Sequence, residues 1–375
     1  MNRFSRKVLT QRELDEVVCA HERHLAYQPG GVRAVLASTK LNNLNLAKRK
    51  LVEADFSFAS LVGVTAYESD FERANLMCTD LRDCDLRSTS LERADIRGAS
   101  MCGARLAFAK LDCADMRNIT VQYKGPSADG SRTEAITRVD FSNASLRGVS
   151  FGRAKLEGVN FTGAILEGAN FKDAQLTNVC FKNAVLIGVN LADLAVPPAA
   201  LEGCLMSMTE KAAARADFLA AMLEEHQLCI ATHGARGAQA VLDDEDLRAI
   251  SQFFAGKELG GLFARRATAF GIDFSGCQLQ GARFEGADLR ECKFNGADLR
   301  GASFRNAKLS HADFENANLG NLIFPNGKTQ APDFTGAEAR KIQFSRAILQ
   351  TNIAELGLAA EAYPGHFPQI KSELG

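Results

Sequence analysis

The side chains of this sequence that could do chemistry are six histidines and an acidic run at Asp243–Asp246. Imidazoles and paired carboxylates are the usual general acids and bases of enzymes. His21 and His226, however, lie within apolar stripes of two predicted helices, which is typical of packing or capping, and an acidic run beside a turn is typical of a solvated surface. No Ser/His/Asp or Cys/His grouping can be argued, and no GxxxxGK[ST] phosphate loop occurs. The sequence therefore predicts a protein that is not an enzyme and has no catalytic residue, cofactor or metal.

The elements that would have to position such side chains follow a period of five residues. Between residues 139 and 191 every fifth residue is large and apolar, and a small or β-branched residue stands two positions before it, as Ala144 does before Leu146. Neither a helix nor a simple strand has this period, but two apolar positions separated by one residue share a side in an extended chain. Each pentad thus predicts a short extended piece followed by a turn, and the chain coils into a solenoid. The large positions are Phe141, Leu146, Phe151, Leu156, Phe161, Leu166, Phe171, Leu176, Phe181, Leu186 and Leu191.

The pattern of a small residue, Asp or Asn, Leu or Phe, and two polar residues or Gly resembles the pentapeptide-repeat family. That resemblance implies a right-handed quadrilateral β-helix with four pentads per coil. The fold class expected from it is an all-β solenoid, with the repeats in two arrays and α-helical segments as caps and insertion. The phenylalanines at the large positions are the predicted core, namely Phe141, Phe151, Phe161, Phe171 and Phe181 in the first array and Phe284, Phe294, Phe304 and Phe314 in the second.

The order of segments predicts five regions. Residues 1–38 form a capping helix and turn, and residues 39–195 form the first β-helix, whose register is interrupted by a loop at 122–138. Residues 196–270 form a helical insertion or second cap. Residues 271–350 form the second β-helix, and 351–375 the C-terminal tail.

The two helical regions look like copies of each other. Thr10 and Glu13 form a capping-box pattern at the start of the first helix, and its apolar stripe recurs 205 residues later, so that His21 corresponds to His226. A tandem duplication of helix, Gly turn and pentapeptide array explains this offset. The segment 243–272 shows no stable register. The second array runs from Phe274 to Leu349, with Phe324 among its large positions, and a small bulge at residues 325–332 interrupts it.

Cysteine usage and the chain termini bear on the compartment. The 375 residues carry a formal net charge of −1 and ten cysteines without a CxxC pair. Cys84, Cys277 and Cys292 occupy the small inward position of a pentad, which favours reduced core thiols. The opening residues are basic but lack the apolar core of a signal peptide, and no apolar run approaches the length of a membrane span. We expect a cytoplasmic protein that does not bind membranes.

The outward residues decide between two functional hypotheses. Asp or Asn just before the large residue can hydrogen-bond the local turn. Asp55, Asn75, Asp95 and Asp115 would also stack into one row, and some pentapeptide-repeat proteins are acidic rods that imitate DNA and protect type II topoisomerases. Such imitation needs a strong charge of one sign, whereas arginines stand two residues after Asp95 and Asp115. Mixed faces favour ion-pair ladders instead.

The main hypothesis is therefore a non-enzymatic cytoplasmic scaffold that binds an unknown protein partner. The alternative is a DNA-mimicking protein that binds and protects DNA gyrase. We expect no direct binding to nucleic acid, and a homodimer through the terminal coil or the tail stays open. The expected contact elements are the segments that break the register: 200–240, 325–332, and the loop 122–138 with Tyr123, Lys124, Arg132 and Arg138.

Overall fold

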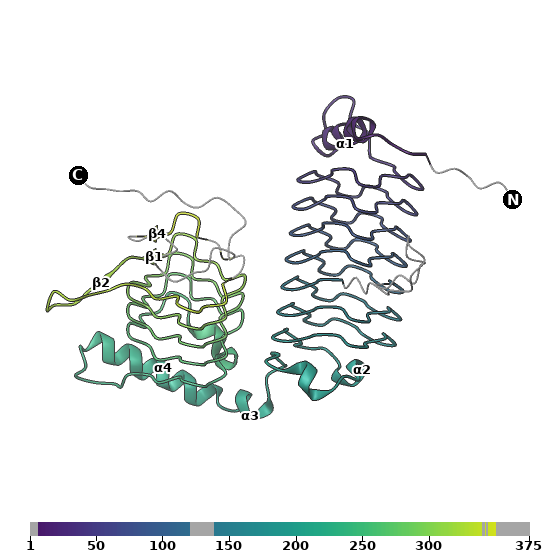
Figure 1. Ribbon diagram of the computed structural model, residues 1–375. Helices are drawn as coiled ribbons and strands as arrows, with labels where there is room; N and C mark the ends of the chain where they lie inside the picture. Colours follow the sequence, from purple (N-terminus) through teal and green to yellow (C-terminus); the bar gives the residue numbers. More distant parts are fainter. Residues whose placement is uncertain (1–6, 121–138, 340–341, 343, 350–375) are drawn as a thin grey trace. The chain divides into compact units, whose positions relative to one another are not determined.

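The computed structural model describes residues 7–120, 139–339, 342 and 344–349, and Figure 1 shows them as stacked coils. The chain divides into two compact units, Met1–Ser207 and Met208–Gly375. Each is a repeat β-helix built from isolated parallel bridges between successive coils. The predicted solenoid is confirmed.

One coil of the first unit takes 20 residues and forms four bridges. The bridging residue is the one just before each large position, so that Asp55 pairs with Asn75 and Asn75 with Asp95. The backbone makes the same two bonds at each bridge: Asn75 N–H donates to Ala54, and Phe56 N–H donates to Asn75. Pentad spacing therefore places residues 20 apart directly above one another, and each outward position becomes a row along the unit.

The turn of each pentad depends on two positions. The Asp or Asn before the large residue accepts a backbone hydrogen bond within the turn, as Asp70 Oδ1 does from Glu72 N–H at 3.0 Å, which confirms the predicted turn role. The second residue after the large position has a positive φ, for example 69° at Gly63 and 54° at Arg73. Glycine adopts this left-handed conformation without strain. At Gly63 the hydrogen is also required for space, because a Cβ there would collide with the side chain of Asn43.

The interruption after residue 120 leaves the register unchanged. Arg105 pairs with Asp140 and Thr120 with Lys155, so the coil resumes in the same phase. The predicted loop itself lies outside the described residues. The first unit ends in α2 (Leu191–Leu194) and a 3₁₀ turn η1 (Pro198–Leu201). Leu191, predicted as an inward position, is 46% exposed because the chain leaves the coil at α2.

The helix α1 (Gln11–Leu25) lies at the start of the first unit, and its predicted capping box is present. Glu13 N–H donates to Thr10 Oγ1 at 3.4 Å, and Thr10 N–H donates to Glu13 Oε2 at 2.8 Å. Leu14, Val18 and His21 are buried on one face of α1. Leu14 and Val18 belong to the same apolar cluster as the coils.

The second unit begins with α3 (Glu210–Ala213) and α4 (Ala216–Ala231), whose buried residues Leu219, Leu223 and His226 match those of α1. Its ladder starts at Val241, which pairs with Phe263. The segment 243–272 has no visible register in the sequence and falls mostly within the predicted helical insertion, but in the structure it already forms coil.

Two local features hid this register. Val241 pairs 22 residues ahead with Phe263, whereas Glu258 pairs 20 residues ahead with Gln278, and the two additional residues are taken up near the 3₁₀ segment η2 (Leu247–Phe253). In addition, the large positions 264 and 269 are occupied by alanine, with Leu262 supplying the bulk from the position that is usually small.

The C-terminal part of the second unit contains its only regular strands among the described residues. β1 (Asn318–Leu319) pairs in parallel with β4 (Ile348–Leu349), and β2 (Leu322–Ile323) pairs antiparallel with β3 (Thr329–Gln330). The β2–β3 hairpin occupies the place of the predicted bulge and extends away from the coils (Figure 1).

The core of both units is a column of stacked side chains. Phe141 and Phe161 lie on successive coils with ring centroids 5.4 Å apart and planes 8° from parallel, and Phe294 and Phe314 repeat this at 4.8 Å and 12°. Aromatic pairs at such offsets contribute beyond the area they bury. The nine phenylalanines expected in the core are each at most 1% exposed: Phe141, Phe151, Phe161, Phe171, Phe181, Phe284, Phe294, Phe304 and Phe314.

Candidate interaction surfaces

The outward surface of the coils is organised by Asp–X–Arg triplets. In each triplet the Asp bridges two coils and the Arg two residues later turns back onto it, with Nε to Oδ1 at 2.8–2.9 Å and Nη2 to Oδ2 at 2.5–2.8 Å. Such two-point pairs combine strength with defined geometry. Described pairs are Asp80–Arg82, Asp85–Arg87, Asp95–Arg97, Asp115–Arg117, Asp246–Arg248, Asp288–Arg290 and Asp298–Arg300.

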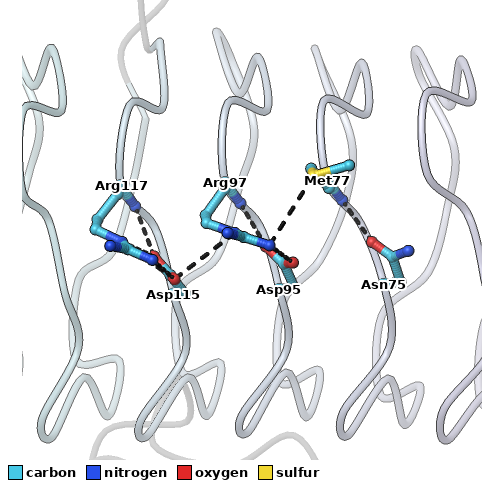
Figure 2. Close-up of polar contacts among 6 residues, drawn as sticks. All are labelled: Asn75, Met77, Asp95, Arg97, Asp115 and Arg117. Atoms are coloured by element: carbon cyan, nitrogen blue, oxygen red, sulfur yellow. Dashed lines mark hydrogen bonds and ion pairs between the residues drawn. The ribbon is translucent and has the colours of Figure 1, made fainter.

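Figure 2 shows how one row of these triplets runs along the first unit. Arg97 pairs with Asp95 of its own pentad and also lies 3.7 Å from Asp115 on the next coil. The hydrogen bonds from Arg97 lower the pKa of Asp95, against a smaller opposing effect of burial. Asn75 continues the row without a charge and accepts a bond from Met77 N–H at 3.2 Å. The predicted ion-pair ladder is confirmed for this row.

The consequence is a row whose carboxylates are largely neutralised. DNA carries about one charge per 1.7 Å of its axis, while coils of a β-solenoid are spaced by roughly 4.8 Å. In the row of Figure 2 the carboxylates of Asp95 and Asp115 are each paired with a guanidinium. This row therefore lacks the continuous negative charge that a DNA-binding protein would recognise.

The β2–β3 hairpin differs from this surface, because it carries exposed apolar side chains. Ile323 is 70% exposed and Phe324 38% exposed. Its base is held on the coil: Gln330 Nε2 donates to Gly301 O at 2.5 Å, and a Cβ at Gly301 would lie 2.7 Å from Leu322 Cβ. Glycine at 301 thus allows the hairpin to approach the coil closely.

Phe324 corrects an expectation from the sequence, which counted it as an inward position of the register. The Leu322–Phe324 run precedes a Pro–Asn–Gly turn, and β2 bonds to β3 rather than to a preceding coil. An apolar run beside Pro–Asn–Gly is a hairpin signal that could have identified these residues in advance. Apolar aromatic and aliphatic side chains on a projecting element are typical anchors of protein interfaces.

Of the other predicted contact elements, only the segment 200–240 lies within the described residues. Tyr123, Lys124, Arg132 and Arg138 of the loop 122–138 lie outside the described residues, as does the tail 351–375. The segment 200–240 holds α3 and α4, where Phe218 is 56% exposed.

The histidines of the two helices and the acidic run make structural contacts. His21 Nδ1 accepts Ala34 N–H at 3.1 Å, and His226 Nδ1 accepts Ala240 N–H at 3.1 Å. Among the described residues, no three His, Cys, Asp or Glu side chains gather in a way that could hold a metal ion. The acidic run faces arginines, with Asp243 paired to Arg265.

The inward cysteines are buried thiols that replace the hydroxyls of equivalent pentads. Cys84 Sγ donates to Leu61 O at 3.0 Å, as Thr79 Oγ1 donates to Phe56 O at 2.9 Å. Burial raises the pKa of Cys84 to about 12 and raises that of Cys292 well above its usual value. In the described parts of the chain, no helix combines the length and apolar character needed to cross a bilayer.

Comparison with known proteins gives the same repeat. A family model described as pentapeptide repeats matches eight copies, over residues 50–93, 84–120, 136–163, 154–193, 270–306 and 282–321. No curated protein matches the chain.

Three similar solved structures can be described. A pentapeptide repeat protein from the Arabidopsis thaliana thylakoid lumen is 26% identical, with 31% of this chain and 70% of that chain covered and a TM-score of 0.26. HetL, a pentapeptide repeat protein involved in heterocyst differentiation regulation in Nostoc sp. strain PCC 7120, is 20% identical over 87% and 92%, with a TM-score of 0.14. QnrB1, a plasmid-mediated fluoroquinolone resistance protein, is 18% identical over 47% and 93%, with a TM-score of 0.17.

Proposed function

For this chain, which belongs to the pentapeptide-repeat family, we propose a function as a non-enzymatic scaffold whose coils hold protein-binding elements at fixed positions. The β2–β3 hairpin is its main contact element. The observation that carries this proposal is the contrast between a frame whose outward Asp–X–Arg pairs neutralise each other and a hairpin with Ile323 and Phe324 exposed. A single partner protein with an apolar pocket fits the two side chains.

The test is affinity purification from the native host with the full-length chain and with a hairpin variant, Ile323→Ser combined with Phe324→Ser. Phe58→Ser is the matched control, because Phe58 is 46% exposed but stands on a regular coil turn. We expect a partner that is recovered with the wild type and the control and lost with the hairpin variant. Recovery of the same proteins by all three, or of none, rejects the hairpin as the contact element.

We further propose that the chain consists of two arrays, each closed at its N-terminal end by a helix, α1 and α4. The end coil of a β-solenoid presents backbone groups and an open core, which favour aggregation. The burial of Leu14 and Val18 of α1 against the first coils supports this role. Deletion of residues 1–35 should produce soluble aggregates or loss of expression, and a monomeric folded truncation in sedimentation would contradict it.

We place the protein in the cytoplasm, since its ten cysteines are free thiols. The competing function, protection of DNA gyrase by DNA imitation, is separated by a supercoiling assay with purified gyrase and a quinolone. The paired Asp95 and Asp115 lead us to expect neither rescue of supercoiling nor binding to gyrase.

A further inference from the structure

The first coil of the first unit exposes an edge. On two of its four faces both backbone groups of the bridging residue are bonded, and on a third face the N–H is bonded. Interior bridging residues donate their N–H and offer their C=O to the preceding coil, but the first coil has none before it. At Lys40 the extended segment around Val8 supplies the missing strand: Lys40 N–H donates to Lys7 O at 2.8 Å, and Leu9 N–H donates to Lys40 O at 3.2 Å.

Side chains of α1 bond the bridging residues of two further faces. The amide of Gln11 imitates a strand at Asn45, accepting from Asn45 N–H at 2.7 Å and donating to Asn45 O at 2.9 Å. The carboxylate of Glu22 accepts from Lys50 N–H at 3.2 Å.

The fourth face remains open at Val35. Its neighbour Ala34 is capped by His21, but among the described residues nothing bonds the N–H or C=O of Val35, which is 65% exposed. An open strand edge with both backbone groups free is a template for an added strand. Proteins that bind extended peptides use such edges, and the backbone bonds supply affinity.

The charge around this edge indicates the chemistry of the occupant. Arg33 stands two residues before Val35, and Lys40 is the next bridging residue of the same coil, with Lys7 beside it. Arg23 lies on α1, and all four cations are exposed. No ion pair between described residues includes any of the four. Hydrogen bonds from Thr10 lower the pKa of Glu13, and the charge of Lys7 lowers it further. Burial lowers the pKa of His21, whereas Glu22 lies close enough to raise it, and Arg33 Nε donates to Glu53 O at 2.7 Å. The nearest carboxylate in the row is Asp55 on the following coil, which accepts from Ser57 N–H. The excess positive charge fits an acidic segment.

We propose that the Val35 edge binds an acidic, extended peptide segment of a partner protein, which adds as a parallel strand beside Val35. This site is separate from the β2–β3 hairpin. The second unit has a comparable open residue in Val241, which is 49% exposed, but its neighbours Asp243 and Asp244 are paired with Arg265 and Arg266. The Val241 edge therefore lacks the positive charge and should not select an acidic strand.

The experiment measures anisotropy of a fluorescein-labelled peptide, Asp-Glu-Val-Val-Glu-Asp, on the full-length protein. Two matched peptides replace the acidic residues by lysine or carry N-methyl groups on the central valines. Val35→Pro removes the free N–H without removing an internal hydrogen bond, and Val241→Pro is the control at the other edge. We expect Val35→Pro to weaken binding of the acidic peptide about tenfold, the usual effect of one hydrogen bond, and Val241→Pro to leave it unchanged.

A second variant guards against a folding defect in Val35→Pro. Arg33→Glu with Lys40→Glu should weaken the acidic peptide about three- to tenfold and favour the lysine peptide. Lys155→Glu, a change at an exposed bridging position of the Lys40 row, is its control. Absence of binding to the wild type, equal binding of the acidic and lysine peptides, or full binding of the N-methylated peptide overturns the proposal.

Discussion

Each unit begins with a helix whose histidine bonds the first inward alanine of the coil, His21 to Ala34 and His226 to Ala240, both at 3.1 Å. Beyond this shared bond the two ends differ. In the first unit Gln11 and Glu22 also bond edge residues of the coil. The equivalent positions in α4 are Ala216 and Gln227, and no bond from either to a described coil residue occurs.

This difference separates two tasks of an end helix. Covering the apolar core needs only a stripe of large side chains, and both helices retain it. Sealing the backbone edge needs a polar side chain or a backbone segment at each bridging residue, because an N–H or C=O binds one partner at a defined place. Both helices have the first property, while the second differs between the units.

The largest expected effect tests the shared task. Leu14→Ala and Leu219→Ala should each lower the free energy of unfolding by about 2–5 kcal/mol, since both side chains are fully buried. Urea unfolding measures this, and hydrogen–deuterium exchange assigns the loss to one unit. Phe218→Ala, at an exposed position of α4, is the control and should change stability by less than about 0.5 kcal/mol. A loss at only one of the two leucines would mean that the helices do not share this task.

The next effect tests the edge. Glu22→Ala removes the ion pair with Arg49, in which Glu22 and Arg49 are 31% and 25% exposed, and also the bond to Lys50 N–H. We expect a loss of about 1–3 kcal/mol, confined to the first unit. Gln227→Ala is the matched change in the second unit and should have almost no effect. Equal losses from both variants would remove the distinction between the ends.

A smaller effect concerns pH. Burial lowers the pKa of His21 and of His226 below 6.5. Backbone groups oppose the shift at both histidines, that of Val52 at His21 and those of Leu259 and Gly260 at His226. The charges of His24 and Arg33 lower the pKa of His21 further, and Glu22 raises it.

Because the unfolded chain then binds more protons than the folded one, stability should fall as the pH decreases from about 6.5 towards the folded pKa values. Unfolding midpoints at several pH values measure this. His21→Gln and His226→Gln should each flatten the dependence, and an unchanged slope in both variants would assign it to other groups.

The smallest effect is on thiol reactivity. Cys84 in the first unit and Cys277 in the second should resist alkylation in the native protein, whereas the exposed Cys19 and Cys78 should react. Mass spectrometry of labelled peptides distinguishes them. In the Leu219→Ala variant, Cys277 should become alkylated faster than Cys84, because the substitution loosens only the second unit. Faster alkylation of Cys84 would contradict the idea that each helix stabilises its own unit.

Much of this architecture could be predicted because its rules are local. The capping box of Thr10 and Glu13 and the Asp–X–Arg pairs lie within a few residues of each other, so spacing alone indicates them. The column of phenylalanines follows from a period that repeats without exception around Phe161.

Where the period weakens, the same reasoning fails. Alanine at 264 and 269 carries no size signal, and the additional residues near η2 shift the phase, so the start of the second ladder was misplaced. The prediction for Phe324 is wrong for the opposite reason. This residue continues the five-residue period, but the chain turns into a hairpin there.

The sequence by itself determined the coil, because each pentad specifies its own turn and its own inward side chains, and repetition stacks them. The tertiary structure alone decided what happens at the ends and exceptions of the stack. Whether Gln11 seals Asn45 or Val35 stays open depends on where α1 lies across the first coil, which involves residues separated by tens of positions. No repeat specifies those contacts, because at the end of a repeating structure there is no further repeat to bind.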